Sequence, residues 1–294
     1  MVYNVCQWTE SMNKVLGSSV KSLTLLLLLS GILSALLLAG CTTTTTTSTT
    51  TTGNMTNDKG KKPEVDREKA LQNRLQLALG YMGKGDNNRA REHLNKATEM
   101  NSRSPEVHDV WGLLYQRQGE LKEAELHYKK ALSYDPTFTR GRNNYGLFLL
   151  RSNRLEEAYQ QFVIGSQDLG YPNRAELFYK LGFTAQKLNK AKEAEEAFTK
   201  AALLNPKMSI AYLELAEIDY KRGDYSRAQL FLNKYSVTKP NTSPRGLWLG
   251  IRLEHSLGNK DAEASQGMAL RNLFPDSKEN KEYQSWLKNE QKNQ

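Results

Sequence analysis

One pattern of apolar and small residues recurs along the chain from Leu71 towards the C-terminus. Successive units lie 34, 34, 36, 34 and 34 residues apart, and each contains two stretches whose apolar residues follow helical periodicity. A unit of this length cannot bury its apolar face alone, so neighbouring units must stack and share one core. The repeat therefore predicts an all-α fold, with units that begin at Leu71, Pro105, Thr139, Ala175, Ser209 and Ser243.

Small residues occupy two fixed places in every unit, where they let helices approach closely. In the first helix a large apolar residue precedes a small one, as in Trp111-Gly112 and Tyr145-Gly146. In the second helix an alanine recurs, at Ala90, Ala124, Ala158, Ala194, Ala228 and Ala262. This pattern resembles the tetratricopeptide repeat, a helix–turn–helix unit of about 34 residues. The resemblance implies a right-handed superhelix of six tetratricopeptide repeats over residues 66–290, closed by a C-terminal capping helix.

Two units depart from the pattern. The third carries Gly165 where alanine is usual, and the turn "DLGYPNRA" after it holds two extra residues. In the sixth, Gln266 replaces the large core residue. The segment "SKENKEYQSWLKNE" that follows is polar apart from Tyr283, Trp286 and one leucine. We expect it to form the capping helix with both aromatic rings folded back, because a stack without a cap ends in bare apolar surface.

The N-terminal region has the features of a secretory signal peptide. Lys14 and Lys21 precede a leucine-rich stretch, Ser22–Gly40, which carries no charge and ends in small residues. We therefore interpret residues 1–40 as a signal peptide. Translation from Met12 would give a signal of conventional length, so we expect the natural protein to start at Met12 and residues 1–11 to be an upstream extension that does not belong to it.

The end of this region, Leu38-Ala39-Gly40-Cys41, resembles the lipobox of bacterial lipoproteins. The resemblance implies cleavage before Cys41, a diacylglycerol on its sulfur and a fatty acyl chain such as palmitate on its new amino group. Thr42 stands where aspartate would retain a lipoprotein at the inner membrane, which favours the outer membrane. The alternative is an uncleaved anchor helix, since 19 uncharged residues just span a bilayer core of roughly 30 Å.

Residues 42–52 are threonines and one serine, and the next residues are polar. Such a composition cannot bury a core, so we predict that residues 41–65 form a disordered tether behind the lipidated cysteine. Stretched out, a tether of this length reaches up to ~80 Å at ~3.3 Å per residue.

Charge and motif content argue against several classes of function. The net charge of +9 comes from basic residues that are scattered among Asp and Glu, whereas nucleic-acid binding requires a basic stripe. We therefore expect no nucleic-acid partner. The four histidines show no zinc-site spacing, and no nucleophile motif or phosphate-binding loop occurs. We predict a protein that is not an enzyme and that carries no metal or cofactor other than the lipid on Cys41.

A stack of such repeats has an inner face lined by first helices. The residues directly after the small positions are Leu79, Leu113, Leu147 and Phe183, then Glu217 and Ile251. The first four predict an apolar floor that binds a protein partner, although some of them could instead pack between neighbouring helices. Basic residues recur at the edge of this floor, where they either meet an acidic segment or are simply solvated: Arg117, Arg151, Lys187 and Lys221.

Several segments are more specific than the repeat itself. They are "NNYGLFL", "SQDLGYPNRAELFYKLG" and "LWLGIRLEHSLGNKDAEASQGMALRNLFPDS". With the lipobox and six repeats, they resemble the type IV pilus biogenesis/stability lipoproteins of the PilF/PilW kind. The resemblance implies an outer-membrane pilotin, lipid-anchored and facing the periplasm, that binds secretin (PilQ-like) subunits and promotes their localisation and multimerisation, and thereby pilus extension and twitching motility.

We expect partner contacts in the first three units, at Leu79, Leu113, Asn143, Asn144 and Leu147, because the asparagine pair lies within an apolar floor. Two alternatives remain. One is a lipid-anchored repeat scaffold for another envelope assembly, such as cell-wall synthesis or outer-membrane protein insertion. The other is an enzyme regulator or a hydrolase whose site has no recognisable motif.

Overall fold

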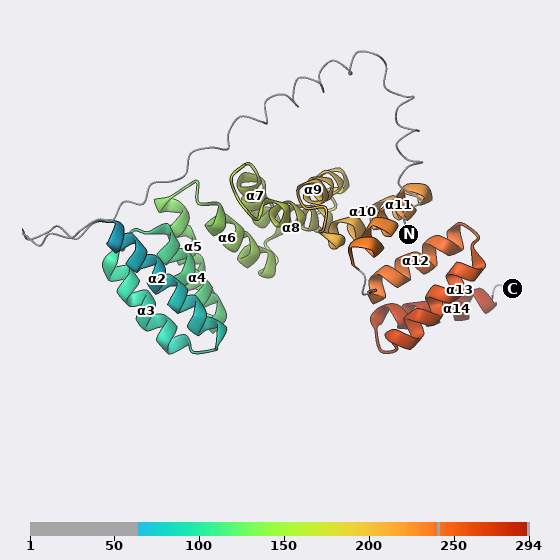
Figure 1. The fold of residues 1–294 in the computed structure, drawn as a ribbon, viewed down its shortest axis with the longest axis horizontal. Helices are drawn as coiled ribbons and strands as arrows, with labels where there is room; N and C mark the ends of the chain where they lie inside the picture. Colours follow the sequence, from blue (N-terminus) through green and yellow to red (C-terminus); the bar gives the residue numbers. More distant parts are fainter. Residues whose placement is uncertain (1–63, 240–241, 293–294) are drawn as a thin grey trace, which may run out of the picture. The chain divides into compact units, whose positions relative to one another are not determined.

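The computed structural model describes residues 64–239 and 242–292, and these residues form helices without a strand (Figure 1). Twelve of the thirteen described helices make six antiparallel pairs, as the repeat period predicts, and the last stands alone. The signal peptide, Cys41 and the tether up to residue 63 lie outside the described residues. The helices are α2 (Glu64–Gly83), α3 (Asn87–Met100), α4 (Pro105–Gln118), α5 (Leu121–Tyr134), α6 (Thr139–Arg151), α7 (Leu155–Ser166), α8 (Arg174–Lys187), α9 (Ala191–Leu204), α10 (Ser209–Arg222), α11 (Tyr225–Thr238), α12 (Pro244–Ser256), α13 (Lys260–Leu273) and α14 (Lys278–Lys292).

Local signals set where these helices begin and end. Ser104 and Ser243 cap α4 and α12, because each hydroxyl accepts a hydrogen bond from a backbone N–H three residues on and a proline follows each serine. Gly119 ends α4 and Gly223 ends α10 with φ of 82° and 83°. This left-handed conformation suits glycine, which has no Cβ to clash.

The small residues of the first helices allow the predicted close approach. A Cβ placed on Gly146 would lie 2.5 Å from Cε1 of Phe162, and one on Gly182 would lie 2.8 Å from Cδ1 of Phe198. Each aromatic ring therefore lies directly on the backbone of the first helix of its own repeat. In repeat 6 the Gln266 side chain takes the place of the ring against Gly250.

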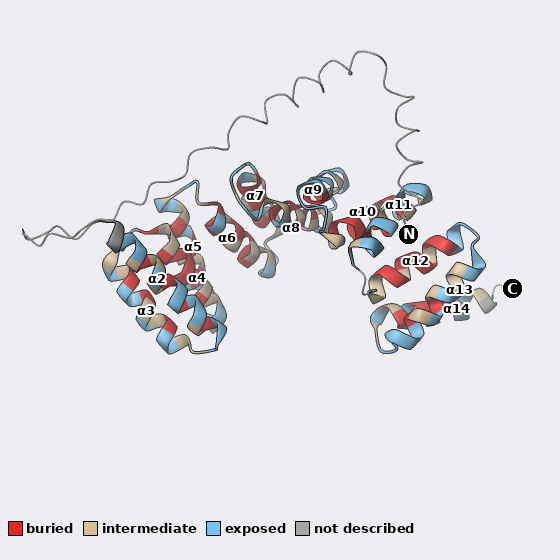
Figure 2. Cartoon of the chain, viewed as in Figure 1, coloured by how far each residue is buried: buried red, intermediate tan, exposed pale blue. Residues whose placement is uncertain are grey.

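The core runs along the stack between the helices (Figure 2). Tyr128, Phe162 and Phe198, the large residues of the second helices, are fully buried. Ala124, Ala158 and Ala228 are fully buried as well, whereas Ala262 in repeat 6 is only half-buried. The last repeat is therefore the most loosely packed at these positions.

Helix α14 covers the end of the stack, which confirms the predicted capping helix. It packs on α12 and α13, and the buried ring of Tyr283 lies against Trp248 and Trp286, with centroids 5.9 and 6.1 Å away. Leu247 and Ile251 of α12 are buried in the same cluster. Helix α14 therefore covers α12 much as the first helix of a seventh repeat would.

Candidate protein-binding face

The residues that follow the small position of each first helix form what we call the inner row: Leu79, Leu113, Leu147, Phe183, Glu217 and Ile251. The first four are accessible, since Leu79 is 41% exposed and Leu113, Leu147 and Phe183 are half-buried. Glu217 is 7% exposed and Ile251 is fully buried. The accessible apolar part of the inner row is therefore confined to repeats 1–4.

Ion pairs occupy the corresponding region of repeats 5 and 6. Arg245 of α12 binds buried Glu214 of α10 with both guanidinium nitrogens, at 2.6 and 2.8 Å. Arg252 donates to Glu217 at 3.0 Å, and its guanidinium lies 5.0 Å from the centre of the Tyr220 ring. Hydrogen bonding to Glu214 raises the pKa of Arg245. These contacts join two repeats and leave no apolar floor there.

The predicted asparagine pair bridges repeats and does not stand free on the surface. Asn144 donates to both carboxylate oxygens of Asp109 in the preceding repeat, at 2.9 and 3.0 Å. Asn143 is 8% exposed, and its side-chain oxygen accepts from Lys180 of the next repeat at 2.8 Å. Arg140 lies 3.4 Å from Asp109, yet burial outweighs both partners and raises the Asp109 pKa to about 6. Both asparagines are thus already engaged in contacts between repeats.

No motif in the sequence marks these partners as a pair. The bonded residues Asp109 and Asn144 are 35 positions apart, and Asn143 and Lys180 are 37 apart. The separation is close to the repeat period, so the period itself was a usable signal that equivalent first-helix positions of neighbouring repeats meet.

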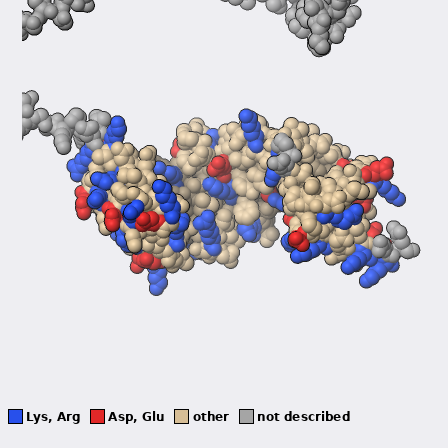
Figure 3. Space-filling view, turned by 60° about the horizontal axis from the view of Figure 1, so that its bottom comes forward, with Lys and Arg blue, Asp and Glu red and all other residues tan. Residues whose placement is uncertain are grey.

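The predicted basic edge is exposed. Arg117, Arg151, Lys187 and Lys221 all face solvent, and none of them forms an ion pair within the described part of the chain. The ammonium group of Lys187 lies 5.1 Å from the centre of the Phe183 ring. On the face drawn in Figure 3, Asp and Glu lie among the scattered basic side chains. The edge can therefore offer charge to a partner beside the apolar inner row.

The first repeat exposes additional apolar surface. Leu77 is 44% exposed, whereas its equivalents Leu215 and Leu249 are almost fully buried against the preceding repeat. A hollow of about 480 Å³ opens beside it, lined by Asn73, Gln76, Leu77, Gly80, Tyr81 and Lys84. The first position of the stack thus presents apolar side chains that interior repeats cover.

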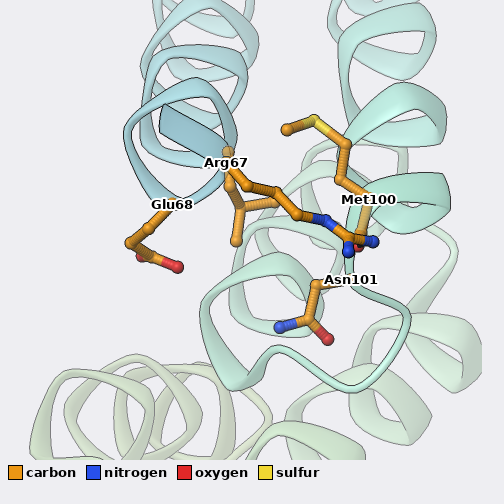
Figure 4. A pocket seen from close by; sticks show the side chains of 5 residues that line it. Arg67, Glu68, Met100 and Asn101 are labelled. Carbon is orange, nitrogen blue, oxygen red and sulfur yellow. Dashed lines mark hydrogen bonds between the residues drawn. The ribbon is translucent and has the colours of Figure 1, made fainter. Parts of the chain in front are cut away.

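A second hollow, of about 330 Å³, lies where the start of α2 meets the end of α3 (Figure 4). Arg67 reaches across from α2 and donates to the backbone oxygen of Met100 at 2.6 Å. Glu68 and Asn101 also line it. Leu71 and Met100 complete the lining, and Arg67 is already hydrogen-bonded within the hollow.

Two histidines pair in repeat 2. The Nδ1 atoms of His108 and His127 lie 3.0 Å apart, and His108 Nε2 contacts the backbone oxygen of Ser102 at 3.0 Å. Burial is the largest cause that lowers the pKa of His127 to about 4. Among the residues described, no three His, Cys, Asp or Glu side chains converge as a metal site would require.

Three segments match family models of the tetratricopeptide repeat: residues 71–104, 105–138 and 185–247. The chain is also 35% identical over 224 residues to the type IV pilus assembly protein PilF of Pseudomonas aeruginosa, a match that covers 76% of this chain and 88% of that protein. The chain belongs to the PilF family. It is a tetratricopeptide-repeat protein of type IV pilus biogenesis, as the sequence segments indicated.

Solved structures agree with this assignment. The structure of Pseudomonas aeruginosa PilF is 35% identical, with a TM-score of 0.68 over 75% of this chain and 99% of that one. That of PilW, described as a widely conserved type IV pilus biogenesis factor, is 26% identical, with a TM-score of 0.62 over 72% of this chain and 97% of that one. From Glu64 onward, this PilF-family chain has no described helix with the length and apolar character of a membrane span.

Proposed function

We propose that the protein is a pilotin, which binds secretin subunits and promotes their localisation and multimerisation at the outer membrane. The observation that carries the proposal is the accessible apolar part of the inner row, Leu79 to Phe183, in a chain of the PilF family. An apolar strip with a basic edge suits a partner segment that is apolar on one side and acidic at its margin.

The proposed anchor is the lipid on Cys41. The order Leu38-Ala39-Gly40-Cys41, after a charged and then an apolar segment, supports lipidation, and Thr42 supports sorting to the outer membrane. Several acyl chains hold a protein firmly, whereas a single chain binds a membrane only marginally. The repeats would then face the periplasm.

The proposed mechanism combines binding with tethering. A secretin subunit held on the inner row travels to the membrane with the lipidated protein. Once there, neighbouring subunits are confined near one surface, which raises their effective concentration for multimer formation. The protein would act by holding and delivering a partner, and no bond is made or broken.

The first test changes the inner row. Leu113→Glu with Leu147→Glu should abolish secretin multimers in the outer-membrane fraction, because each substitution places a charge on the proposed contact. Arg117→Glu with Arg151→Glu tests the exposed basic edge, where folding is not at risk. Leu126→Glu with Leu230→Glu, two residues about half exposed on second helices, is the matched control. Normal multimers in both test variants, with unchanged circular dichroism, would contradict the proposal.

The second test removes the anchor. Cys41→Ser should leave secretin monomers at their usual level and deplete outer-membrane multimers, measured after membrane fractionation. If multimers persist, and crosslinking instead captures cell-wall synthesis enzymes or barrel-insertion proteins, the protein serves another envelope assembly.

A further inference from the structure

The three most exposed large apolar side chains of the described residues lie in consecutive repeats, at or just after the end of the second helix. Leu169, Leu203 and Val237 are 79%, 75% and 81% exposed, and the next, Leu273, is 62% exposed. Leu203 and Val237 lie in the last turns of α9 and α11, one repeat apart, whereas Leu169 lies three residues after the end of α7. We call these three residues the apolar edge.

The fold does not require apolar residues there. The positions equivalent to Leu203 and Val237 in repeats 1 and 2 are Glu99 and Ser133, which are also exposed. Isolated exposed apolar residues are common on soluble proteins, but packing gives no reason for a row of the most exposed ones on three successive repeats. Their exposures also show that they touch little protein, so they are projecting tips and not the walls of a groove.

The surroundings of Leu203 are basic, whereas Leu169 has Asp168 beside it. Lys200 and Lys207 flank Leu203 along the chain, and all three side chains are exposed. No Asp or Glu occurs from Ala197 to Leu213. In repeats 1 and 2 the corresponding stretches contain acidic residues.

The same arrangement recurs one repeat later. Lys234 and Lys239 flank Val237, and both are exposed. From Tyr225 to Leu253 the sequence again contains no Asp or Glu. Two neighbouring repeats therefore each present an aliphatic tip between two lysines, without an acidic residue in the same stretch.

We propose that the apolar edge of repeats 3–5 rests on an anionic phospholipid surface. Aliphatic tips can enter the boundary between headgroups and acyl chains, while flanking lysines remain at the anionic headgroups. Short, separate tips suit a fluid surface, whereas a protein partner requires a continuous complementary one. The inference rests on the lipid anchor of the proposed function, which would bring the repeats beside the membrane, and it adds an orientation that the anchor alone does not impose.

The test measures the local environment of single residues in the full-length lipidated protein. Val237→Cys would carry an environment-sensitive fluorophore, with the protein reconstituted in vesicles of phosphatidylethanolamine with roughly 30% phosphatidylglycerol. We expect a blue shift and about a threefold drop in quenching by aqueous iodide relative to the protein in detergent, because the tip enters the interface. Vesicles of phosphatidylcholine alone should give a much smaller change.

The matched control places the same probe at the equivalent position of repeat 2, with Ser133→Cys. It should show detergent-like quenching in both kinds of vesicle. A further variant, Leu203→Asp with the probe at residue 237, should restore most of the quenching, whereas Ser133→Asp should not. Neither Leu203 nor Val237 belongs to the inner row, so secretin multimers can be assayed in the same variants.

The outcomes separate the two proposals. Equal quenching at residues 237 and 133 in anionic vesicles overturns the membrane contact, even if the protein still supports secretin multimers. A shift at residue 237 that requires added secretin also overturns it, because the edge would then be a protein interface. The fluorescence shift could also occur on anionic vesicles while secretin multimers form equally well without the protein. That result would uphold the membrane contact and contradict the pilotin role.

Discussion

Repeats 1–4 and repeats 5–6 share one backbone plan but present different inner rows. The first region leaves four apolar side chains accessible, from Leu79 to Phe183. In the second, Arg245 and Arg252 hold Glu214 and Glu217, and α14 covers Ile251. The same register thus leaves apolar side chains accessible in one region and closes the stack in the other. The difference shows that a repeat position has no fixed role until its neighbours are in place.

The largest predicted effect compares an interior repeat with the last one. Phe198→Ala should lower the free energy of unfolding by about 3–5 kcal/mol, because it removes a fully buried ring that packs on Gly182. Gln266→Ala, at the equivalent place in repeat 6, should cost less than about 1 kcal/mol. Urea unfolding followed by circular dichroism measures both. Equal losses would contradict the view that repeat 6 is loosely packed.

The next prediction concerns the buried acids on the inner side of each region. Arg245→Ala should destabilise the protein by about 3 kcal/mol or more, because Glu214 is 2% exposed and loses both of its bonds to a guanidinium. Arg140→Ala should cost less, since Asp109 keeps both hydrogen bonds from Asn144. The same urea titrations at neutral pH test the order of the two variants. A larger loss for Arg140→Ala would show that the amide does little to hold Asp109.

The smallest effect is a dependence of stability on pH that comes from Asp109. Its pKa is about 6 in the folded protein against 3.8 for a free side chain, so between these values the folded state holds a proton that the unfolded chain has lost. This residue alone therefore lowers the free energy of unfolding as pH rises from about 4 to 6, by up to about 3 kcal/mol at ~1.4 kcal/mol per pKa unit. Asp109→Asn should remove this contribution.

A second titrating group gives the opposite sign in the same window and serves as a check. The His127 pKa of about 4 lies below its usual 6.5, so its contribution to stability is lost as pH falls. Between pH 4 and 6, His127→Gln should therefore make the free energy of unfolding fall more steeply with rising pH. Asp109→Asn should instead make it rise with pH. If the free energy of unfolding depended on pH in the same way in both variants, neither the raised pKa of Asp109 nor the lowered pKa of His127 would be supported.

From Glu64 onward, the sequence by itself determined the number of described helices, their order and their principal core residues. A 34-residue period, a small residue in each first helix and an alanine in each second helix are local requirements of helix packing, so they appear directly in the residues. The capping role of Tyr283 and Trp286 was also predictable, because a stack must cover its last apolar face.

Only the tertiary structure decided which inner-row positions stay accessible. Leu113 and Ile251 have similar residue types and the same register, yet one is half-buried and the other fully covered because α14 packs on α12. The roles of Asn143 and Asn144 likewise depend on partners 35 and 37 residues away, at Asp109 and Lys180. Such contacts are set by how neighbouring repeats rotate against each other, which is a property of the packed stack and of no single repeat.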